Sequence, residues 1–179
     1  GLDRNVYTGF VDIIDPDTGY LYHKLTVALH VNDSLRVVEG GDLTIQQAID
    51  AAIDGDVVLV AGGNYSGEGN TNIDLRGKAI SVRSESGPLV TTVDGLDADR
   101  GFILKRGEDR RTIIEGFTIQ NGNVPSDRES GGGIFASTTV TATFANLRLI
   151  NNRGFYGGGI YAGNGVSIQN SRFTGGDSD

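Results

Sequence analysis

The residues best suited to catalysis are acidic and lie in one short stretch of the chain. Asp97 and Asp99 stand two positions apart, Asp94 precedes them, and Arg100 and Lys105 follow. Side chains two residues apart on an extended strand point to the same side, so this spacing allows two carboxylates to share a site. Paired carboxylates with separated pKa values cleave glycosidic bonds by acid–base chemistry. Asp97, Asp99 and Arg100 are therefore the candidate catalytic residues.

A structural interpretation of the same stretch is favoured. Asp94-Gly95 and Asp97-Ala98-Asp99 are typical of turns, where an aspartate caps nearby backbone groups and glycine takes conformations that other residues avoid. Catalysis also needs a convergent geometry, which spacing alone does not establish. The sequence thus leans towards a chain that is not an enzyme and leaves catalysis open.

Metal and cofactor chemistry has little support in the residue types. The chain has no cysteine, which excludes disulfides and thiolate metal sites. Asp15 and Asp17 fit the start of a calcium loop, but Gly19 stands where a further ligand is needed, and no closing glutamate follows. His23 and His30 are an odd number of residues apart, so on one strand they face opposite sides. No cofactor is expected, and calcium is the weaker alternative.

Composition and charge restrict the partners. The 179 residues include 28 glycines but only 3 prolines, and the formal net charge is −8. Nucleic acids and anionic membranes attract basic patches, so neither is expected to bind this acidic chain. No apolar run reaches the roughly 18 residues that predict a membrane-spanning helix. We therefore expect no transmembrane segment.

One sequence unit occurs twice near the C-terminus. Gly-Gly-Gly-Ile begins the two copies at Gly131 and Gly157, 26 residues apart, and each copy continues into β-prone residues around an asparagine. Residues 116–121 match the end of the unit. Self-similarity with a period of this size predicts a solenoid, in which successive coils stack on one another.

Stacking of the coils predicts which side chains lie beside one another. We expect apolar columns inside the coil and asparagine amide ladders at its corners. One apolar column contains Ile119, Leu149 and Phe173. A second contains Phe117 and Leu147 and ends at Ser171. The ladders pair Asn121 with Asn151 and Asn146 with Asn170.

The remaining segments predict one helix, several short strands and an N-terminal hairpin. Apolar residues at helical spacing predict a helix over residues 43–53, with Thr44 or Asp42 as N-cap and Gly55 at its end. Strands are expected over residues 56–61, 72–75, 79–83, 90–93, 102–105 and 112–120. Residues 1–42 lack the repeat and predict a hairpin around a turn at 15–19. We expect two domains, an N-terminal extension over 1–42 and a coil over 43–179.

These patterns resemble a known superfamily. Residues 44–52 and 55–65 resemble the opening of right-handed parallel β-helix proteins of the pectin-lyase-like superfamily, and residues 112–122 resemble their later coils. The two Gly-Gly-Gly-Ile units are similar to repeats of bacterial polymorphic outer-membrane and other cell-surface β-helix proteins. The resemblance implies an all-β, right-handed parallel β-helix with an N-terminal capping helix. The resemblance also implies that the relatives act on polysaccharides. Lyases among them use an arginine or lysine as the base together with carboxylates that bind calcium, and hydrolases use two or three carboxylates.

The function favoured by these patterns is a non-enzymatic structural or adhesive module, extracellular or at the cell surface. A β-helix exposes strand edges wherever it is not capped, and the sequence shows no cap after its last repeat. Either the natural chain continues after this repeat, or another subunit covers it. The N-terminal extension can add strands to its own coil or to a neighbouring copy. In the second case we expect self-association with the C-terminal coil, head to tail, into a filament. The alternative is a polysaccharide lyase or hydrolase, or a carbohydrate-binding β-helix, that uses Asp97, Asp99 and Arg100 in a groove.

Overall fold

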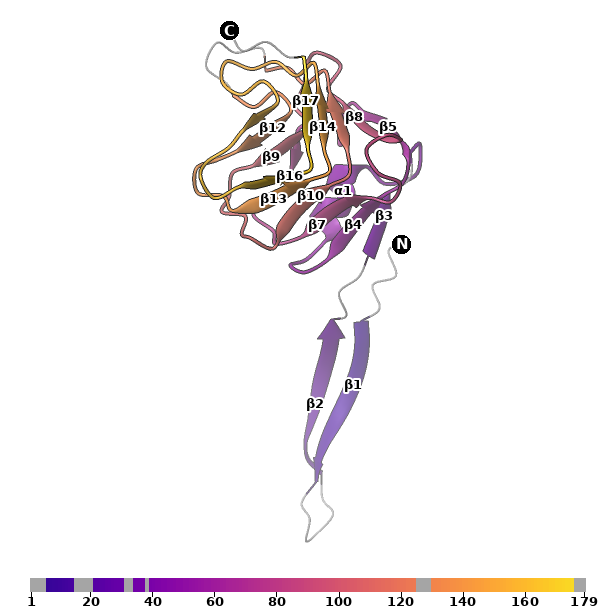
Figure 1. The fold of residues 1–179 in the computed structure, drawn as a ribbon. Helices are drawn as coiled ribbons and strands as arrows, with labels where there is room; N and C mark the ends of the chain where they lie inside the picture. Colours follow the sequence, from indigo (N-terminus) through magenta and orange to yellow (C-terminus); the bar gives the residue numbers. More distant parts are fainter. Residues whose placement is uncertain (1–5, 15–20, 31–33, 38, 125–129, 176–179) are drawn as a thin grey trace. The chain divides into compact units, whose positions relative to one another are not determined.

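The structure is a computed structural model that describes residues 6–14, 21–30, 34–37, 39–124 and 130–175. The chain divides into two compact units, Gly1–Asp33 and Ser34–Asp179. In the first unit, β1 (Val6–Ile14) and β2 (Leu21–His30) pair as an antiparallel hairpin. The predicted hairpin is therefore present (Figure 1). Its turn, with Asp15 and Asp17 of the suggested calcium loop, lies outside the described residues.

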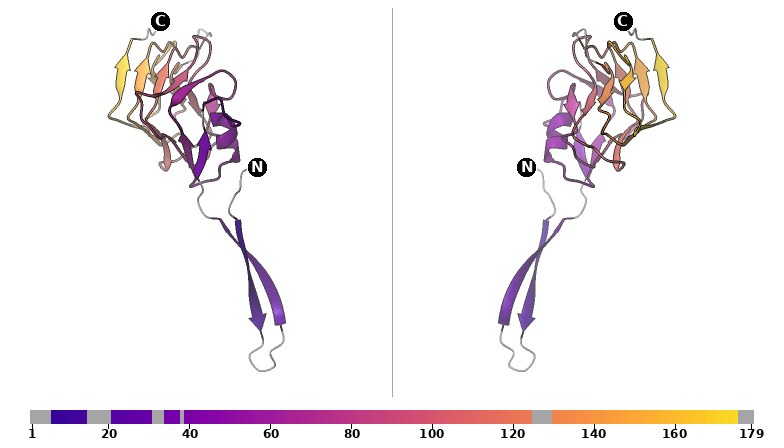
Figure 2. Two further views of the ribbon diagram at one scale, coloured as in Figure 1. Left: turned by 90° about the vertical axis from the view of Figure 1, so that its right-hand side faces the viewer. Right: turned by 90° about the vertical axis from the view of Figure 1, so that its left-hand side faces the viewer.

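The second unit winds through three parallel sheets. The six-strand sheet contains β3 (Ser34–Val37), β4 (Val57–Val60), β7 (Ser81–Ser84), β10 (Thr112–Glu115), β13 (Ala142–Ala145) and β16 (Ser167–Gln169). The five-strand sheet contains β5 (Gly63–Ser66), β8 (Thr91–Asp94), β11 (Thr118–Gln120), β14 (Arg148–Ile150) and β17 (Arg172–Thr174). The four-strand sheet contains β6 (Ile73–Asp74), β9 (Phe102–Leu104), β12 (Ile134–Ala136) and β15 (Ile160–Tyr161). Strands of successive turns lie side by side in all three sheets (Figures 1 and 2).

This arrangement is the right-handed parallel β-helix that the sequence predicts. Four turns, from β4 to β15, place one strand in every sheet. The coil begins earlier than the sequence suggests, because β3 pairs in parallel with β4 from Ser34↔Val57 to Val37↔Val60. Along the chain, the boundary between the two units therefore lies between residues 33 and 34, whereas the sequence predicts it between 42 and 43.

The core is a set of inward columns, one side chain from each turn. Ile119 pairs with Leu149, and Leu149 pairs with Phe173, as predicted. Ile119 and Leu149 are buried, but Phe173 in the last described turn is 51% exposed. Phe117 and Leu147 are also buried. Phe173 belongs to β17, the last strand of its sheet, and so has a neighbouring strand on one side only. Val37 of β3, at an edge too, is buried, and α1 packs against that strand.

The corners between sheets depend on left-handed backbone conformations. The run 112–120, expected as one strand, is two strands because Gly116 turns the chain at a φ of 83°. At the corresponding corner of the next turn Asn146 has a φ of 53°, and Asn121 has a φ of 50° at another corner. The amides of these two asparagines donate to carboxylates of the preceding turns, Asn121 to Asp94 at 3.0 Å and Asn146 to Glu115 at 2.9 Å. The asparagines therefore fix corners through carboxylates rather than through the expected amide ladders.

The repeated glycine triplet has a packing explanation. Gly131 adopts a φ of 72°, a left-handed conformation that favours glycine. Gly132 is required for a different reason, because a Cβ atom there would lie 2.0 Å from the carbonyl oxygen of Arg153 in the following turn. The triplet thus combines a tight turn with close contact between backbones of adjacent turns.

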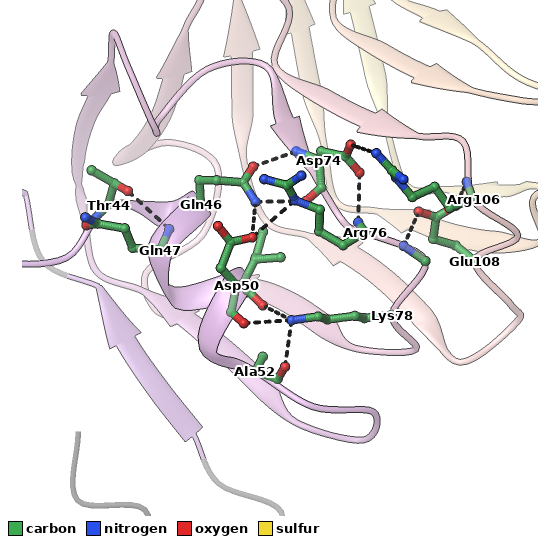
Figure 3. Close-up of polar contacts among 12 residues, drawn as sticks. Thr44, Gln46, Gln47, Asp50, Ala52, Asp74, Arg76, Lys78, Arg106 and Glu108 are labelled. Carbon is green, nitrogen blue, oxygen red and sulfur yellow. Dashed lines mark hydrogen bonds and ion pairs between the residues drawn. The ribbon is translucent and has the colours of Figure 1, made fainter. Parts of the chain in front are cut away.

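Helix α1 (Ile45–Ala51) packs on the first turns of the coil, against β3, β4 and β6. Thr44 is its N-cap and forms a capping box with Gln47 (Figure 3). Ile45 and Ala48 are fully buried, as the predicted stripe requires, whereas Ile53 lies beyond the helix and is 37% exposed. The helix ends at Ala51 rather than 53, so the stripe extends past it by two residues.

Polar side chains fix this helix to the coil. Gln46 Oε1 accepts a bond from the Asp74 amide of β6 at 2.8 Å, and Gln46 Nε2 donates to the Asp74 carbonyl at 3.0 Å. Lys78 Nζ donates to the carbonyl oxygens of Ile49, Asp50 and Ala52 at 2.7, 2.9 and 2.8 Å (Figure 3). The Ile49 carbonyl also accepts from the Ala52 amide at 3.1 Å. Carbonyls at a helix C-terminus are short of backbone donors, so Lys78 serves as an additional cap from outside the helix.

Candidate functional site

Asp94 is a structural carboxylate. It ends β8 and is buried at the corner that follows. It accepts hydrogen bonds from Gln120 Nε2 at 2.7 Å, Asn121 Nδ2 at 3.0 Å and the Leu96 amide at 3.0 Å. Burial acts to raise the pKa of Asp94, but these three hydrogen bonds outweigh it and leave the pKa below its ordinary value. The carboxylate is therefore ionised at neutral pH and joins two turns.

Asp97 and Asp99 have different partners. The exposed Asp97 adopts a φ of 56°, and its carboxylate lies 3.9 Å from Arg153 Nη1 in a later turn. Asp99 accepts hydrogen bonds from residues of the preceding turn, Thr71 Oγ1 at 2.9 Å and Asn72 Nδ2 at 2.6 Å. The two carboxylates are thus held towards opposite ends of the coil, which agrees with the turn interpretation of this stretch.

Arg100 and Lys105 instead flank a groove on the outward side of the four-strand sheet. The groove has a volume of about 520 Å³ and is lined by Arg100, Ile103, Lys105, Ser130, Phe135, Ser137, Thr138 and Tyr161. Ile103, Phe135 and Tyr161 occupy matching positions in β9, β12 and β15. We call this surface the four-strand face.

The aromatic pair forms one wall of this groove. The Phe135 and Tyr161 rings are stacked with centroids 5.6 Å apart and planes inclined by 5°. The Arg100 guanidinium carbon lies 5.5 Å from the Phe135 centroid, within the range of a cation–π interaction. The Phe135 ring thus packs against Tyr161 and also lies beside the Arg100 guanidinium.

A second groove continues from the first towards α1. It has a volume of about 510 Å³ and shares Ile103 and Lys105 with the first groove. Its lining adds the carboxylates of Glu68, Asp74 and Asp99, the guanidinium of Arg76, and Gln46 from the helix. Asp74 is already engaged, because its carboxylate accepts from the Arg76 amide at 2.8 Å and lies 3.6 Å from Arg106 Nη2 (Figure 3). The two grooves together follow the stacking direction of the coil.

Of the residues predicted for a site, the structure places Asp99 and Arg100 along these two grooves, and Asp97 lines neither. Phe135 and Tyr161 are not among the residues predicted from the sequence for a site. Both occupy the position after isoleucine in the Gly-Gly-Gly-Ile units, next to an inward residue. Alternation in a strand therefore places them outward, and this is the signal that could have found them.

Metal ligands do not gather in the described part of the chain. There, no group of three or more histidine, aspartate or glutamate side chains is arranged to hold a metal ion. Calcium binding remains a prediction, and it rests on residues outside those ranges. None of the helices in the described ranges is long and apolar enough to span a membrane.

Comparison with known proteins identifies the fold. No protein-family model matches the sequence, and no curated protein matches it. Among solved structures, the chain is similar to a mutant of the PL6 family alginate lyase AlyGC, with a TM-score of 0.54 and 17% identity. The likeness covers 79% of this chain and 20% of the lyase chain. The fold that the two chains share is a parallel β-helix. At this identity the likeness concerns the fold alone.

Proposed function

We propose that this β-helix binds an acidic polysaccharide along the four-strand face. The observation that carries the proposal is the groove in which the stacked Phe135 and Tyr161 lie beside Arg100 and Lys105. Among the described residues that line this groove, the charged side chains are Arg100 and Lys105, in a chain that as a whole carries −8. Cationic side chains in a groove favour an anionic ligand over a neutral one.

The shape of the surface fits a linear ligand. The first groove follows the stacked strands β9, β12 and β15, so a sugar chain would contact one turn after another. The second groove is lined by three carboxylates, so we place the acidic chain in the first groove. Carboxylates of the sugar units would be met by Arg100 and Lys105. The solved neighbour is described as an alginate lyase, which supports an acidic polymer as ligand.

Binding is favoured over hydrolysis. Hydrolysis of a glycosidic bond needs two carboxylates across one substrate. Asp97 and Asp99 are held by different neighbours, and of these two only Asp99 lines a groove. Glu68 and Asp74 line the same groove, but Asp74 is already engaged by the Arg76 amide and Arg106. A lyase would instead use an arginine or lysine as base, and Arg100 and Lys105 are the residues to examine for that activity.

Titration calorimetry tests this proposal, with alginate or polygalacturonate as acidic polymers and dextran as the neutral one, at fixed ionic strength. We expect the acidic polymers alone to bind, and Arg100→Gln with Lys105→Gln to weaken binding about tenfold, the equivalent of roughly 1.4 kcal/mol. The matched control is Arg110→Gln, an exposed arginine outside both grooves. Equal binding of dextran, or an equal loss in the control, would contradict the proposal. Release of unsaturated sugar ends would identify a lyase.

A second candidate is a structural or adhesive module that self-associates outside the cell or at its surface. The observation that favours it is the apolar exposure in the last described turn, where Ile168 is 46% and Phe173 51% exposed. Strand addition by the hairpin of a neighbouring copy would cover β16 and β17.

Sedimentation and electron microscopy test this second candidate on a chain that lacks residues 1–33. This deletion removes the hairpin but keeps β3, which pairs with β4 in the coil. We expect the full chain to form filaments and the shortened chain to remain a folded monomer. Filaments of unchanged length after the deletion would exclude the hairpin as the connecting element.

A further inference from the structure

A separate groove lies at the corner between the six-strand and five-strand sheets. It has a volume of about 490 Å³, and its polar side chains are those of Arg83, Ser84, Glu115, Asn146, Arg148, Asn170 and Arg172. Pro88 also lines it, and the Pro88 carbonyl accepts a hydrogen bond from Thr118 Oγ1. This hydrogen bond attaches the segment around Pro88 to Thr118 of β11. Arg148 and Arg172 occupy the matching positions in the next two turns. We call this site the arginine groove.

The arginine groove has an uncompensated positive charge. Arg83 Nε lies 3.4 Å from Glu115, and Asn146 Nδ2 donates to the same carboxylate at 2.9 Å. Within the described residues, no carboxylate lies within ion-pair distance of Arg148 or Arg172. Three arginines against one glutamate leave the groove positive in a chain with a net charge of −8.

The two arginines without a carboxylate partner are neighbours. Arg148 of β14 and Arg172 of β17 are directly paired in the parallel register. Adjacent strands are about 4.8 Å apart, and like charges directly opposite one another destabilise a sheet. An anion between the two side chains would remove this repulsion. Each guanidinium presents a planar fork of N–H donors that matches a carboxylate, sulfate or phosphate group.

We infer that the arginine groove binds an oxyanion, held between the guanidinium groups of Arg148 and Arg172. The ligand is a carboxylate, sulfate or phosphate group, and the segment around Pro88 limits its extent along the coil. The site is made by other sheets than the four-strand face, and it does not depend on the polysaccharide proposal. Loss of binding at Arg100 and Lys105 would leave it unchanged.

Calorimetric titration of the full chain with inorganic sulfate, inorganic phosphate and acetate, at ionic strength fixed with chloride, tests the site. We expect at least one of these ions to bind, and Arg148→Gln with Arg172→Gln to weaken its binding about tenfold or more. The ion most affected names the group that the site prefers. Arg110→Gln is the matched control and is expected to bind like the unmodified chain.

A second double variant, Arg148→Lys with Arg172→Lys, keeps both charges but removes the planar forks. We expect it to bind several-fold more weakly than the unmodified chain, while circular dichroism shows all variants folded. The inference is overturned if no ion binds the unmodified chain, if the glutamine variant binds as well as the unmodified chain, or if the Arg110 control loses as much. Full binding by the lysine variant would also overturn it, because general positive charge would then suffice.

Discussion

At the scale of single residues, the acidic stretch shows how neighbouring carboxylates acquire different tasks. Asp94 joins two turns, Asp97 faces Arg153, and Asp99 binds Thr71 and Asn72. Each task is set by what the adjacent turn presents, since the three side chains lie within six residues of one another in sequence. The arginine that follows them is the residue directed into the proposed binding groove.

Asp94→Asn tests the structural task. Because its folded pKa is lowered, Asp94 stabilises the fold above the unfolded pKa of about 3.9, and this contribution is lost as pH falls through the folded pKa. At pH 7 we expect the variant to lose about 1 to 3 kcal/mol of unfolding free energy. Urea unfolding at several pH values should show the two proteins converging below about pH 4. A difference that is constant with pH would contradict the assignment.

Gly132→Ala tests close contact between turns at a second single residue. An added Cβ would meet the Arg153 carbonyl oxygen at 2.0 Å, so we expect a loss of about 3 kcal/mol or more. The control is Gly107→Ala, where φ is +83° and nothing lies within 4 Å, so that only the backbone conformation is penalised, by about 1 to 2 kcal/mol. Equal losses in chemical unfolding would show that backbone contact is not the reason for the glycine.

At the scale of elements, α1 is stabilised from both ends by different parts of the chain. Its N-terminus is capped locally by Thr44 and Gln47, which the sequence shows directly. Its C-terminus is capped by Lys78, which is 26 or more residues away along the chain. A distant cap cannot be recognised from local sequence signals.

Lys78→Met is expected to remove this cap while preserving most of the side-chain length. Three carbonyl groups at the helix end would lose a charged donor, so we expect a loss of about 1 to 2 kcal/mol. Amides of α1 should also exchange faster with deuterium. Arg110→Met, on an exposed arginine, serves as the control for loss of one positive charge. An effect of the same size in that control would contradict the cap.

The corner between β13 and β14 gives a second prediction at this scale. Asn146 combines a φ of 53° with the hydrogen bond to Glu115. Asn146→Gly loses the hydrogen bond alone, whereas Asn146→Ala loses it and also strains the backbone. We expect the alanine variant to be about 0.5 to 1 kcal/mol less stable than the glycine variant in thermal unfolding. Equal stabilities would show that the left-handed conformation is not a constraint there.

At the scale of the whole coil, stability follows from stacking of each turn on its neighbours. Phe144 and Leu149 are buried between turns, whereas Ile168 and Phe173 of the following turn are about half exposed. Solenoids gain stability from such neighbour contacts, so their outer turns open more easily than their inner ones.

Hydrogen exchange should reveal this gradient. We expect amides of β16 and β17 to exchange much faster than those of β10 and β13, because less apolar surface holds the last turn. Protection of β16 and β17 that rises with protein concentration would support self-association through this turn. Uniform protection of all turns at low concentration would contradict the gradient.

The sequence alone determined the repeating coil, the capping helix and most of the inward columns. These features depend on periodicity, on local capping signals and on self-similarity, all of which are local or repeated along the chain. Alternation could also have placed Phe135 and Tyr161 outward. Only the tertiary structure brought Arg100 and Lys105 beside the aromatic pair, and Arg148 beside Arg172. Those contacts depend on the register between turns and on the length of each corner, so residues far apart in sequence meet only once the coil has closed.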